Sequence, residues 1–350
     1  MERFVYRIID ANFNRAREAC RVIEDICRFA LNNAALTAEL KQLRHQLCTV
    51  ISALDSSKLL SARDTVADVG TTQQVRGQMN RADINDSLTA ACKRLPEALR
   101  VLAETLKPSE PDTARSIEQM RYSFYTLEKD IVRSWSTAKK FSKVKLYVII
   151  TNDHPCEILS LVNSCVEGGA DCIQLRAKSM PDDQLFATAQ EMVKVCRNAD
   201  VLSIVNDRAD IAVAAEADGI HLGQNDLPIE YAQRIALSPL ITGKSTHNMN
   251  QLKKAVSESP TYVSLGPVFS TGTKPEAEPV GLEYVSQAAA YLEDKGIRHI
   301  AIGGITIENI NRVIQAGAKA VAVCSAVTNA PDVTDSCSNL KRKIRDLLDD

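Results

Sequence analysis

Polar side chains follow several short apolar runs in the second half of the sequence. Gln174, Arg176 and Lys178 occupy alternate positions after one run, and Asp207 and Asp226 follow two later runs. Lysine and arginine bind anionic oxygens, whereas carboxylates bind hard divalent cations such as Mg²⁺. If the carboxylates share one cation, this set of residues predicts a metal-assisted diphosphate site. Either carboxylate alone could equally cap a helix, as Asp226, before a Leu-Pro pair, illustrates.

A second group of small and hydroxylated residues predicts a phosphate site without metal. Backbone N–H groups next to a glycine can approach an oxyanion closely, and threonine hydroxyls add donors. The members of this group are Thr271, Gly272, Thr273, Gly304, Cys324 and Ser325. Lys274 directly follows the first three, and its charge is assigned to the diphosphate site.

Both groups belong to a regular alternation of apolar runs and amphipathic segments. The apolar runs are residues 146–151, 172–176, 202–206, 219–222, 240–243, 262–265, 299–303 and 320–324. Eight strand–helix units in about 200 residues predict an α/β fold, a (β/α)8 TIM barrel. The competing architecture is a doubly wound open sheet. In a barrel, the carboxyl ends of the strands form one rim, so both predicted sites lie there.

A diphosphate site beside a monophosphate site suggests a reaction that joins two phosphorylated molecules with loss of pyrophosphate. No triad or zinc-binding cluster is apparent in the sequence. Ser245 and His247 are the nearest approach to a nucleophile–base pair, but no orienting acid accompanies them. We interpret His221 as a hydrogen-bonded histidine that faces the barrel lumen.

The first part of the chain contains a duplicated helical hairpin. Residues 14–24 reappear as residues 93–103, and residues 40–45 reappear as residues 117–122. Apolar residues at helical spacing predict four helices at 9–31, 35–54, 84–107 and 113–134, hence an all-α helical bundle. Two strips of charge, Arg15–Glu18–Arg21 and Arg94–Glu97–Arg100, have two interpretations. They form solvated faces, or they converge with Arg44, Arg121 and the loop at 63–65 on a phosphate.

Composition divides the chain at the same place. The first 140 residues contain two of the 14 glycines, 22 Lys/Arg and 18 Asp/Glu, whereas the remaining 210 contain 20 Lys/Arg and 26 Asp/Glu. We therefore predict domains at 1–138 and 144–350, with a linker at 134–143. Neither charge balance favours a nucleic-acid surface. Scattered cysteines and the lack of a signal sequence or a long apolar segment predict a cytoplasmic protein without a membrane span. A homo-oligomer is compatible with the sequence.

Seven ordered motifs in the second domain resemble thiamine-phosphate synthase. They are QLRAK, NDRAD, GIHLGQNDLP, GKSTHN, GPVFSTGTK, AIGGI and VCSAV. The resemblance implies condensation of 4-amino-2-methyl-5-(diphosphooxymethyl)pyrimidine with a thiazole phosphate, giving thiamine phosphate and pyrophosphate with Mg²⁺. It assigns the metal to Asp207 and Asp226, and the thiazole phosphate to residues 271–273, Gly304, Cys324 and Ser325. It assigns the pyrimidine diphosphate to Gln174, Leu175, Arg176, Ala177, Lys178, Asn206, Ser245 and Lys274, of which Arg176, Lys178 and Lys274 act in catalysis. Cys324 departs from the aliphatic residue usual in this family.

Alternatives remain for each half. The barrel could be a thiazole tautomerase, which needs neither metal carboxylates nor diphosphate-binding lysines, or a regulatory phosphate-sensing protein. The first domain resembles the helical module fused to some thiamine-phosphate synthases. That resemblance implies either a hydroxymethylpyrimidine-phosphate kinase or a non-catalytic docking module.

Overall fold

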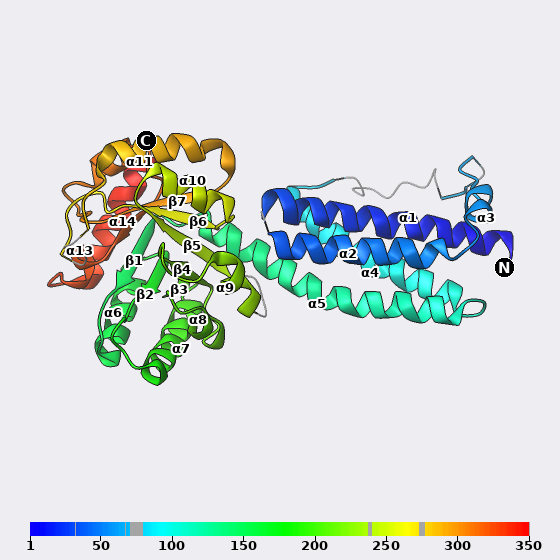
Figure 1. Cartoon of the computed structure of the whole chain (residues 1–350), viewed down its shortest axis with the longest axis horizontal. Coiled ribbons are helices and arrows are strands. Elements are labelled where there is room, and N and C mark those ends of the chain that lie inside the picture. Colours follow the sequence, from blue (N-terminus) through cyan, green and yellow to red (C-terminus); the bar gives the residue numbers. More distant parts are fainter. Residues whose placement is uncertain (32, 67, 71–79, 237–239, 273–276, 350) are drawn as a thin grey trace. The chain divides into compact units, whose positions relative to one another are not determined.

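The computed structural model describes every residue except 32, 67, 71–79, 237–239, 273–276 and 350. It contains two compact units, Met1–Arg133 and Ser134–Asp350 (Figure 1). No described helix combines the length and the apolar composition that crossing a bilayer requires.

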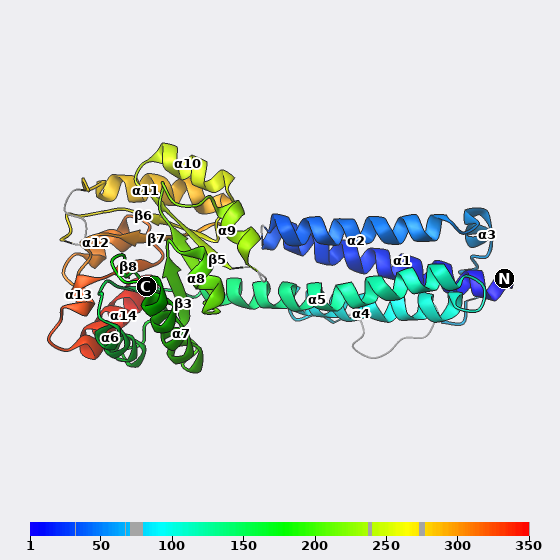
Figure 2. The same cartoon turned by 60° about the horizontal axis from the view of Figure 1, so that its bottom comes forward.

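Long helices lying side by side build the first unit (Figures 1 and 2). Its elements are α1 (Arg3–Asp25), the π-helical turn η1 (Ile26–Ala30), α2 (Ala34–Ser52), α3 (Ser56–Ser61), α4 (Ile84–Leu106) and most of α5 (Pro111–Phe141). Side chains of Asn33, Asp55 and Asp83 cap α2, α3 and α4 by accepting backbone N–H groups. The four predicted long helices are therefore confirmed, with α1 beginning earlier than predicted.

The predicted non-helical linker at 134–143 is wrong up to residue 141, because α5 continues to Phe141. Phe141 is only 3% exposed, and its ring stacks on that of Tyr262 with the centroids 4.4 Å apart. The polar composition of the segment conceals this one apolar anchor. Burial of the phenylalanine ring stabilises the last helical turn against the barrel.

The second unit is a closed parallel barrel, which confirms the predicted (β/α)8 fold. The strands are β1 (Leu146–Ile150), β2 (Cys172–Leu175), β3 (Leu202–Asn206), β4 (Gly219–Leu222), β5 (Ile241–Thr246), β6 (Tyr262–Leu265), β7 (Arg298–Ile302) and β8 (Val321–Val323). Strand β1 pairs with β8 as well as with β2, and this closure excludes the open-sheet alternative.

Helices surround the barrel (Figure 2). They are α6 (Pro155–Glu167), α7 (Asp182–Asn198), α8 (Ala209–Ala214), α9 (Ile229–Ile235), α10 (Met249–Ser257), α11 (Gly281–Leu292), the 3₁₀ turn η2 (Glu293–Lys295), α12 (Ile310–Gln315), α13 (Ser325–Thr328) and α14 (Val333–Asp349).

Alternation along each strand divides the apolar core into two layers. On β2, Ile173 and Leu175 pack in the outer layer between strands and helices, whereas Cys172 packs in the lumen. Gln174 has the same parity as Cys172, so its amide also points inward. The same rule at the other strands brings polar groups from distant parts of the sequence into one lumen.

Candidate active site

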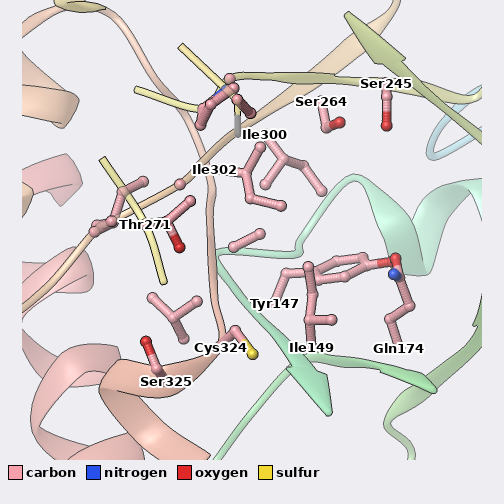
Figure 3. A pocket seen from close by; sticks show the side chains of 18 of the residues that line it. Tyr147, Ile149, Gln174, Ser245, Ser264, Thr271, Ile300, Ile302, Cys324 and Ser325 are labelled. Carbon is pink, nitrogen blue, oxygen red and sulfur yellow. The ribbon is translucent and has the colours of Figure 1, made fainter. Parts of the chain in front are cut away.

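A cavity of about 530 Å³ lies in the barrel among residues at or beyond the carboxyl ends of the strands. This volume is typical of sites for small-molecule ligands. Eight of the predicted site residues line it: Gln174, Arg176, Asn206, Ser245, Thr271, Gly304, Cys324 and Ser325. Figure 3 shows Thr271, Cys324 and Ser325 toward one side of the cavity, and Tyr147 and Gln174 toward another.

Hydrogen bonds fix the polar groups at the base of this cavity. Tyr147 donates its hydroxyl proton to Gln174 Oε1 at 2.7 Å, and Gln174 Nε2 donates to Asn206 Oδ1 at 3.0 Å. Tyr147 and Gln174 are 1% and 2% exposed, so the bond between them lies out of water, whereas the bond to Asn206 is partly buried. The amide of Asn206 is thereby held at the cavity wall by Gln174, which Tyr147 in turn holds in place.

A second set of hydrogen bonds continues across the lumen. The Tyr262 hydroxyl lies 2.9 Å from the Tyr147 hydroxyl and 2.9 Å from His221 Nδ1. His221 Nε2 lies 2.9 Å from Ser245 Oγ. His221 therefore faces the lumen and is hydrogen-bonded at both ring nitrogens, as predicted. The hydrogen-bond partner of Ser245 is His221 and not His247, whose Nδ1 instead contacts the Gly266 carbonyl.

Burial raises the pKa of both tyrosines, Tyr147 and Tyr262, well above the ordinary value, so both hydroxyls keep their protons. Sequence reasoning missed both residues. Their signal was weak, because each tyrosine occupies an inward-facing position in an apolar strand, where an aromatic ring ordinarily serves as core.

The two predicted metal-binding carboxylates lie together. Lys178 Nζ contacts Asp207 Oδ2 at 3.0 Å. Desolvation raises the pKa of Asp226, and hydrogen bonding and repulsion from the neighbouring Asp207 raise it further, while a hydrogen bond from the Gly223 N–H and the charge of Lys178 oppose the shift. Asp207 adopts a left-handed backbone conformation with φ of 62°, which is uncommon for residues other than glycine but which aspartate tolerates better than most.

Asp226 does not cap a helix, because the residue that precedes α9 at its cap position is Pro228 and no side chain caps that helix. Instead, Asp226 Oδ2 accepts the N–H of Gly223 at 2.6 Å, so Asp226 closes its own loop. Its remaining oxygen is available to the pair with Asp207. Two neighbouring carboxylates, one of which has its pKa raised by the other, have an excess of negative charge, which a divalent cation would neutralise.

The donor set fits a cation that takes further ligands from substrate. Among the described residues, no cluster of three or more His, Cys, Asp or Glu side chains could enclose a metal. One or two carboxylates completed by water and phosphate oxygens is the arrangement that Mg²⁺ commonly takes. Arg176, two residues before Lys178, and Asn206, directly before Asp207, line the cavity, so a diphosphate bound there lies within reach of the carboxylates.

The second predicted anion site depends on two consecutive glycines. Gly303 and Gly304 both have positive φ, at 103° and 63°. A Cβ on Gly304 would lie 2.5 Å from the Ser270 carbonyl oxygen, so no other residue fits without displacing that backbone. Asn309 Nδ2 donates to the Gly304 carbonyl at 2.8 Å, and its Oδ1 accepts the N–H of Thr306 at 2.9 Å. Asn309 is a supporting residue that sequence reasoning missed.

Several predicted residues are absent from the cavity wall. Lys178, Asp207 and Asp226 contact one another but are not among its lining residues. Thr273 and Lys274 lie outside the described residues. The side chains of Leu175 and Ala177 are buried in the outer apolar layer, so only their backbone atoms could contact a substrate. Gly272 is described and exposed, and nothing lies within 4 Å of a Cβ built there.

In the first unit, carboxylates pair with several of the arginines that one interpretation brings together on a phosphate. Arg44 and Arg21 contact Glu24 at 2.9 and 3.2 Å. Arg100 and Arg121 contact Glu118 at 3.1 and 3.4 Å.

The duplication thus preserves the arginine pair of each hairpin. The bridging carboxylate, however, belongs to α1 in one hairpin and to α5 in the other. Arg63, which was predicted to join the same site, contacts Asp10 instead at 2.6 Å.

The closed barrel defines the class of (β/α)8 proteins, and the loops after its strands carry the neighbouring carboxylates Asp207 and Asp226 and the positive-φ glycines 303 and 304. Residues 146–327 match the family described as thiamine monophosphate synthase, and residues 7–130 match the ThiD2 family.

Relatives extend over nearly the whole chain. The thiamine-phosphate synthase of Nostoc punctiforme is 40% identical over 335 residues, which cover 95% of this chain and 92% of that protein. The thiamine-phosphate synthase of Synechocystis sp. is 38% identical over 336 residues, covering 96% and 95%. The structure of thiamine phosphate pyrophosphorylase from Pyrococcus furiosus has a TM-score of 0.54 and 35% identity, and it covers 59% of this chain and 98% of its own.

The chain therefore belongs to the thiamine-phosphate synthase family. It is a transferase that forms thiamine phosphate in thiamine biosynthesis, and enzymes of this family use a divalent metal ion.

Proposed function

We propose that the barrel condenses 4-amino-2-methyl-5-(diphosphooxymethyl)pyrimidine with a thiazole phosphate, and that the metal is Mg²⁺ held by Asp207 and Asp226. The observation that carries this proposal is the grouping of Lys178, Asp207 and Asp226 next to a cavity that also has a separate glycine-built anion site. A diphosphate needs the first group, and a monophosphate fits the second.

We assign the pyrimidine diphosphate to residues 174–178 and 206, with Ser245 and Lys274. We assign the thiazole phosphate to residues 271–273, Gly304, Cys324 and Ser325. Support comes from the eight of these residues that line one cavity. Lys274 and Thr273 enter on sequence resemblance alone.

The chemistry requires no protein nucleophile. An electron-rich aminopyrimidine can expel pyrophosphate and leave a stabilised carbocation, which the thiazole nitrogen then captures. A bound Mg²⁺ would supply charge neutralisation on the departing pyrophosphate. Arg176 and Lys178 stabilise the same developing charge, and the cavity walls exclude water and hold the two rings together.

Mg²⁺-dependent release of pyrophosphate from the two substrates tests this proposal. We expect Lys178→Ala and Asp207→Ala to lower turnover by about a hundredfold or more, the scale of losing one charge-stabilising group. Lys194→Ala is a matched control, because Lys194 forms an exposed ion pair with Glu191 on helix α7. Turnover like that of the unsubstituted enzyme in both site variants would refute the assignment.

The same experiment separates the alternatives. A thiazole tautomerase would act on the thiazole without the pyrimidine and would be indifferent to loss of Asp207. A regulatory barrel would bind both phosphates and release no pyrophosphate.

For the helical unit we propose hydroxymethylpyrimidine-phosphate kinase activity, which the ThiD2 family match and the sequence resemblance support. The intact chain is supplied with the pyrimidine monophosphate, ATP, Mg²⁺ and thiazole phosphate, and thiamine phosphate is measured. Product from the pyrimidine diphosphate but none from the monophosphate plus ATP would leave a docking module. That result would leave the barrel assignment intact.

We also propose a cytoplasmic location, which ten free cysteine thiols support. The modest charge of each half favours small-molecule substrates over nucleic acid.

A further inference from the structure

The hydrogen bonds across the barrel lumen form one chain whose proton direction is set from one end. Gln174 Oε1 can only accept, so the Tyr147 hydroxyl donates to it. Having given its proton to Gln174, Tyr147 can only accept from the Tyr262 hydroxyl. The Tyr262 oxygen therefore has its proton directed toward Tyr147 and presents a lone pair on its other side.

The direction of the Tyr262 hydrogen bond determines which nitrogen of His221 is protonated. His221 Nδ1 lies on the lone-pair side of Tyr262, so Nδ1 carries the hydrogen. A neutral imidazole has one N–H, so Nε2 accepts a proton from the Ser245 hydroxyl. The Ser245 oxygen then offers only lone pairs to the cavity that it lines.

The other end of this chain of hydrogen bonds, at Asn206, presents a donor to the cavity. Gln174 Nε2 donates to Asn206 Oδ1, so the Asn206 amide turns its own N–H₂ group, a donor, away from Gln174. Asn206 ends strand β3 and Ser245 is on strand β5, with only β4 between them. This separation corresponds to roughly 10 Å of backbone spacing, which two inward side chains and one heterocycle can fill.

We propose that Tyr147, Tyr262 and His221 are positioning residues that select a 4-aminopyrimidine over its 4-oxo analogue. Their chain of hydrogen bonds fixes Ser245 as an acceptor and Asn206 as a donor. This inference rests on the proposed function of the barrel, because it assigns the specificity of the same site.

The selection follows from the edge of the heterocycle. A 4-aminopyrimidine presents an amino donor next to a ring-nitrogen acceptor, which complements Ser245 and Asn206. The 4-oxo tautomer presents a ring N–H donor next to an oxygen acceptor, which is the inverse pattern. A buried site built for one pattern leaves its polar groups unpaired with the other.

Binding is a cleaner measure than turnover, since the amino group also stabilises the carbocation. The experiment uses the intact enzyme and measures inhibition constants of the 4-amino and 4-oxo pyrimidine monophosphates, without ATP, against Mg²⁺-dependent pyrophosphate release. We expect the unsubstituted enzyme to prefer the 4-amino compound by about a hundredfold, because two hydrogen bonds become mismatched.

Tyr262→Phe interrupts the chain of hydrogen bonds, so that the donor–acceptor direction of each remaining part can reverse. This variant should reduce the preference for the 4-amino compound about tenfold or more. Tyr284→Phe is the matched control. The Tyr284 hydroxyl is also buried and donates to Thr246 Oγ1 at 2.7 Å, but on the outer side of strand β5. The control variant should keep the full preference. Equal preference in the two variants would overturn the inference.

The histidine tautomer gives an independent readout. Nitrogen-15 NMR of histidine-labelled enzyme should show that His221 is protonated at Nδ1. The Nδ1 resonance of His221 should change in the Tyr262→Phe variant. It should stay unchanged in the Tyr284→Phe control. Protonation of His221 at Nε2 would mean that the side-chain amides of Gln174 and Asn206 are flipped and that every hydrogen bond between them and Ser245 has the opposite direction. That result contradicts the proposal. Absence of any pyrophosphate release in the unsubstituted enzyme would instead refute the function, so the two failures are distinguishable.

Discussion

Replacement of Asp226 by asparagine should make the barrel more stable and the enzyme nearly inactive. Two unit charges about 4 Å apart repel by about 4 kcal/mol at an effective dielectric constant of about 20. Lys178 beside Asp207 and access to solvent offset much of that repulsion, so we expect a net gain of about 1 kcal/mol. Asparagine keeps an oxygen that can accept the Gly223 N–H, so the loop stays closed.

The pH dependence has a defined sign. Because the pKa of Asp226 is raised in the folded protein, the folded state binds this proton more tightly than the unfolded state does. Its contribution to stability is therefore lost as the pH rises from the ordinary value through the raised pKa. If Asp226 binds Mg²⁺ as proposed, the affinity for Mg²⁺ has the opposite trend and should fall as the pH drops through that raised pKa.

Thermal unfolding without metal, Mg²⁺ titration and pyrophosphate release test this prediction. Asp226→Asn should raise the unfolding temperature of the barrel by roughly 2–4 °C, and it should lower turnover by about a hundredfold. The control is Asp171→Asn, at a carboxylate that accepts the N–H groups of Lys145 and Leu146 at 2.9 Å each and pairs with Lys341. This control should lose stability and keep its Mg²⁺ response. A lower unfolding temperature in Asp226→Asn, or an unchanged Mg²⁺ requirement, would refute the reasoning.

Three further substitutions test other parts of the site. Gly243→Ala places a Cβ 2.2 Å from Tyr262 Cζ, so it should cost about 1–3 kcal/mol in urea unfolding and lower the 4-amino preference. Phe141→Ala removes the ring that stacks on Tyr262 and should lower the free energy of unfolding by about 3–5 kcal/mol, also measured by urea unfolding. Asn309→Ala releases the Gly304 carbonyl and should raise KM for the thiazole phosphate several-fold, with little change in KM for the pyrimidine diphosphate.

For each of these three predictions, one outcome would contradict it. Gly219→Ala is the control for Gly243→Ala, because its Cβ meets Ile241 and Ile204 and not the hydrogen-bonded chain. Loss of 4-amino preference in both would show a general packing effect. Phe141→Ala with unchanged stability would mean that the ring is not an anchor. Equal changes in both KM values would remove Asn309 from the thiazole side.

The sequence by itself determined the barrel and the location of its chemistry. Parallel strands that alternate with helices place all carboxyl ends at one rim, so residues that follow successive strands must be neighbours. Asp207 and Asp226 follow β3 and β4 and therefore meet, and the glycine pair after β7 lines the same cavity as Ser325 after β8. Such relations need only the order of elements and the two-residue period of a strand.

Only the tertiary structure decided which side chains touch across the lumen. Ser245 is two residues from His247 in the sequence, yet it bonds His221, because inward-facing groups on neighbouring strands are closer than groups on the same turn. Tyr262 joins His221 to Tyr147 from the far side of the barrel, a contact that no local pattern encodes.

The limits of local pattern also appear at the end of α5 and at the charged strips, whose two interpretations the sequence left open. The residues before Phe141 are polar, so only the packing of its ring on Tyr262 reveals why α5 continues to that residue. In the helical unit, helical spacing placed Arg44 and Arg121 on their helices correctly. Helical spacing could not show that Glu24 and Glu118 neutralise these arginines, because each ion pair depends on how two helices pack side by side. The buried apolar faces decide that packing, and the charges themselves do not.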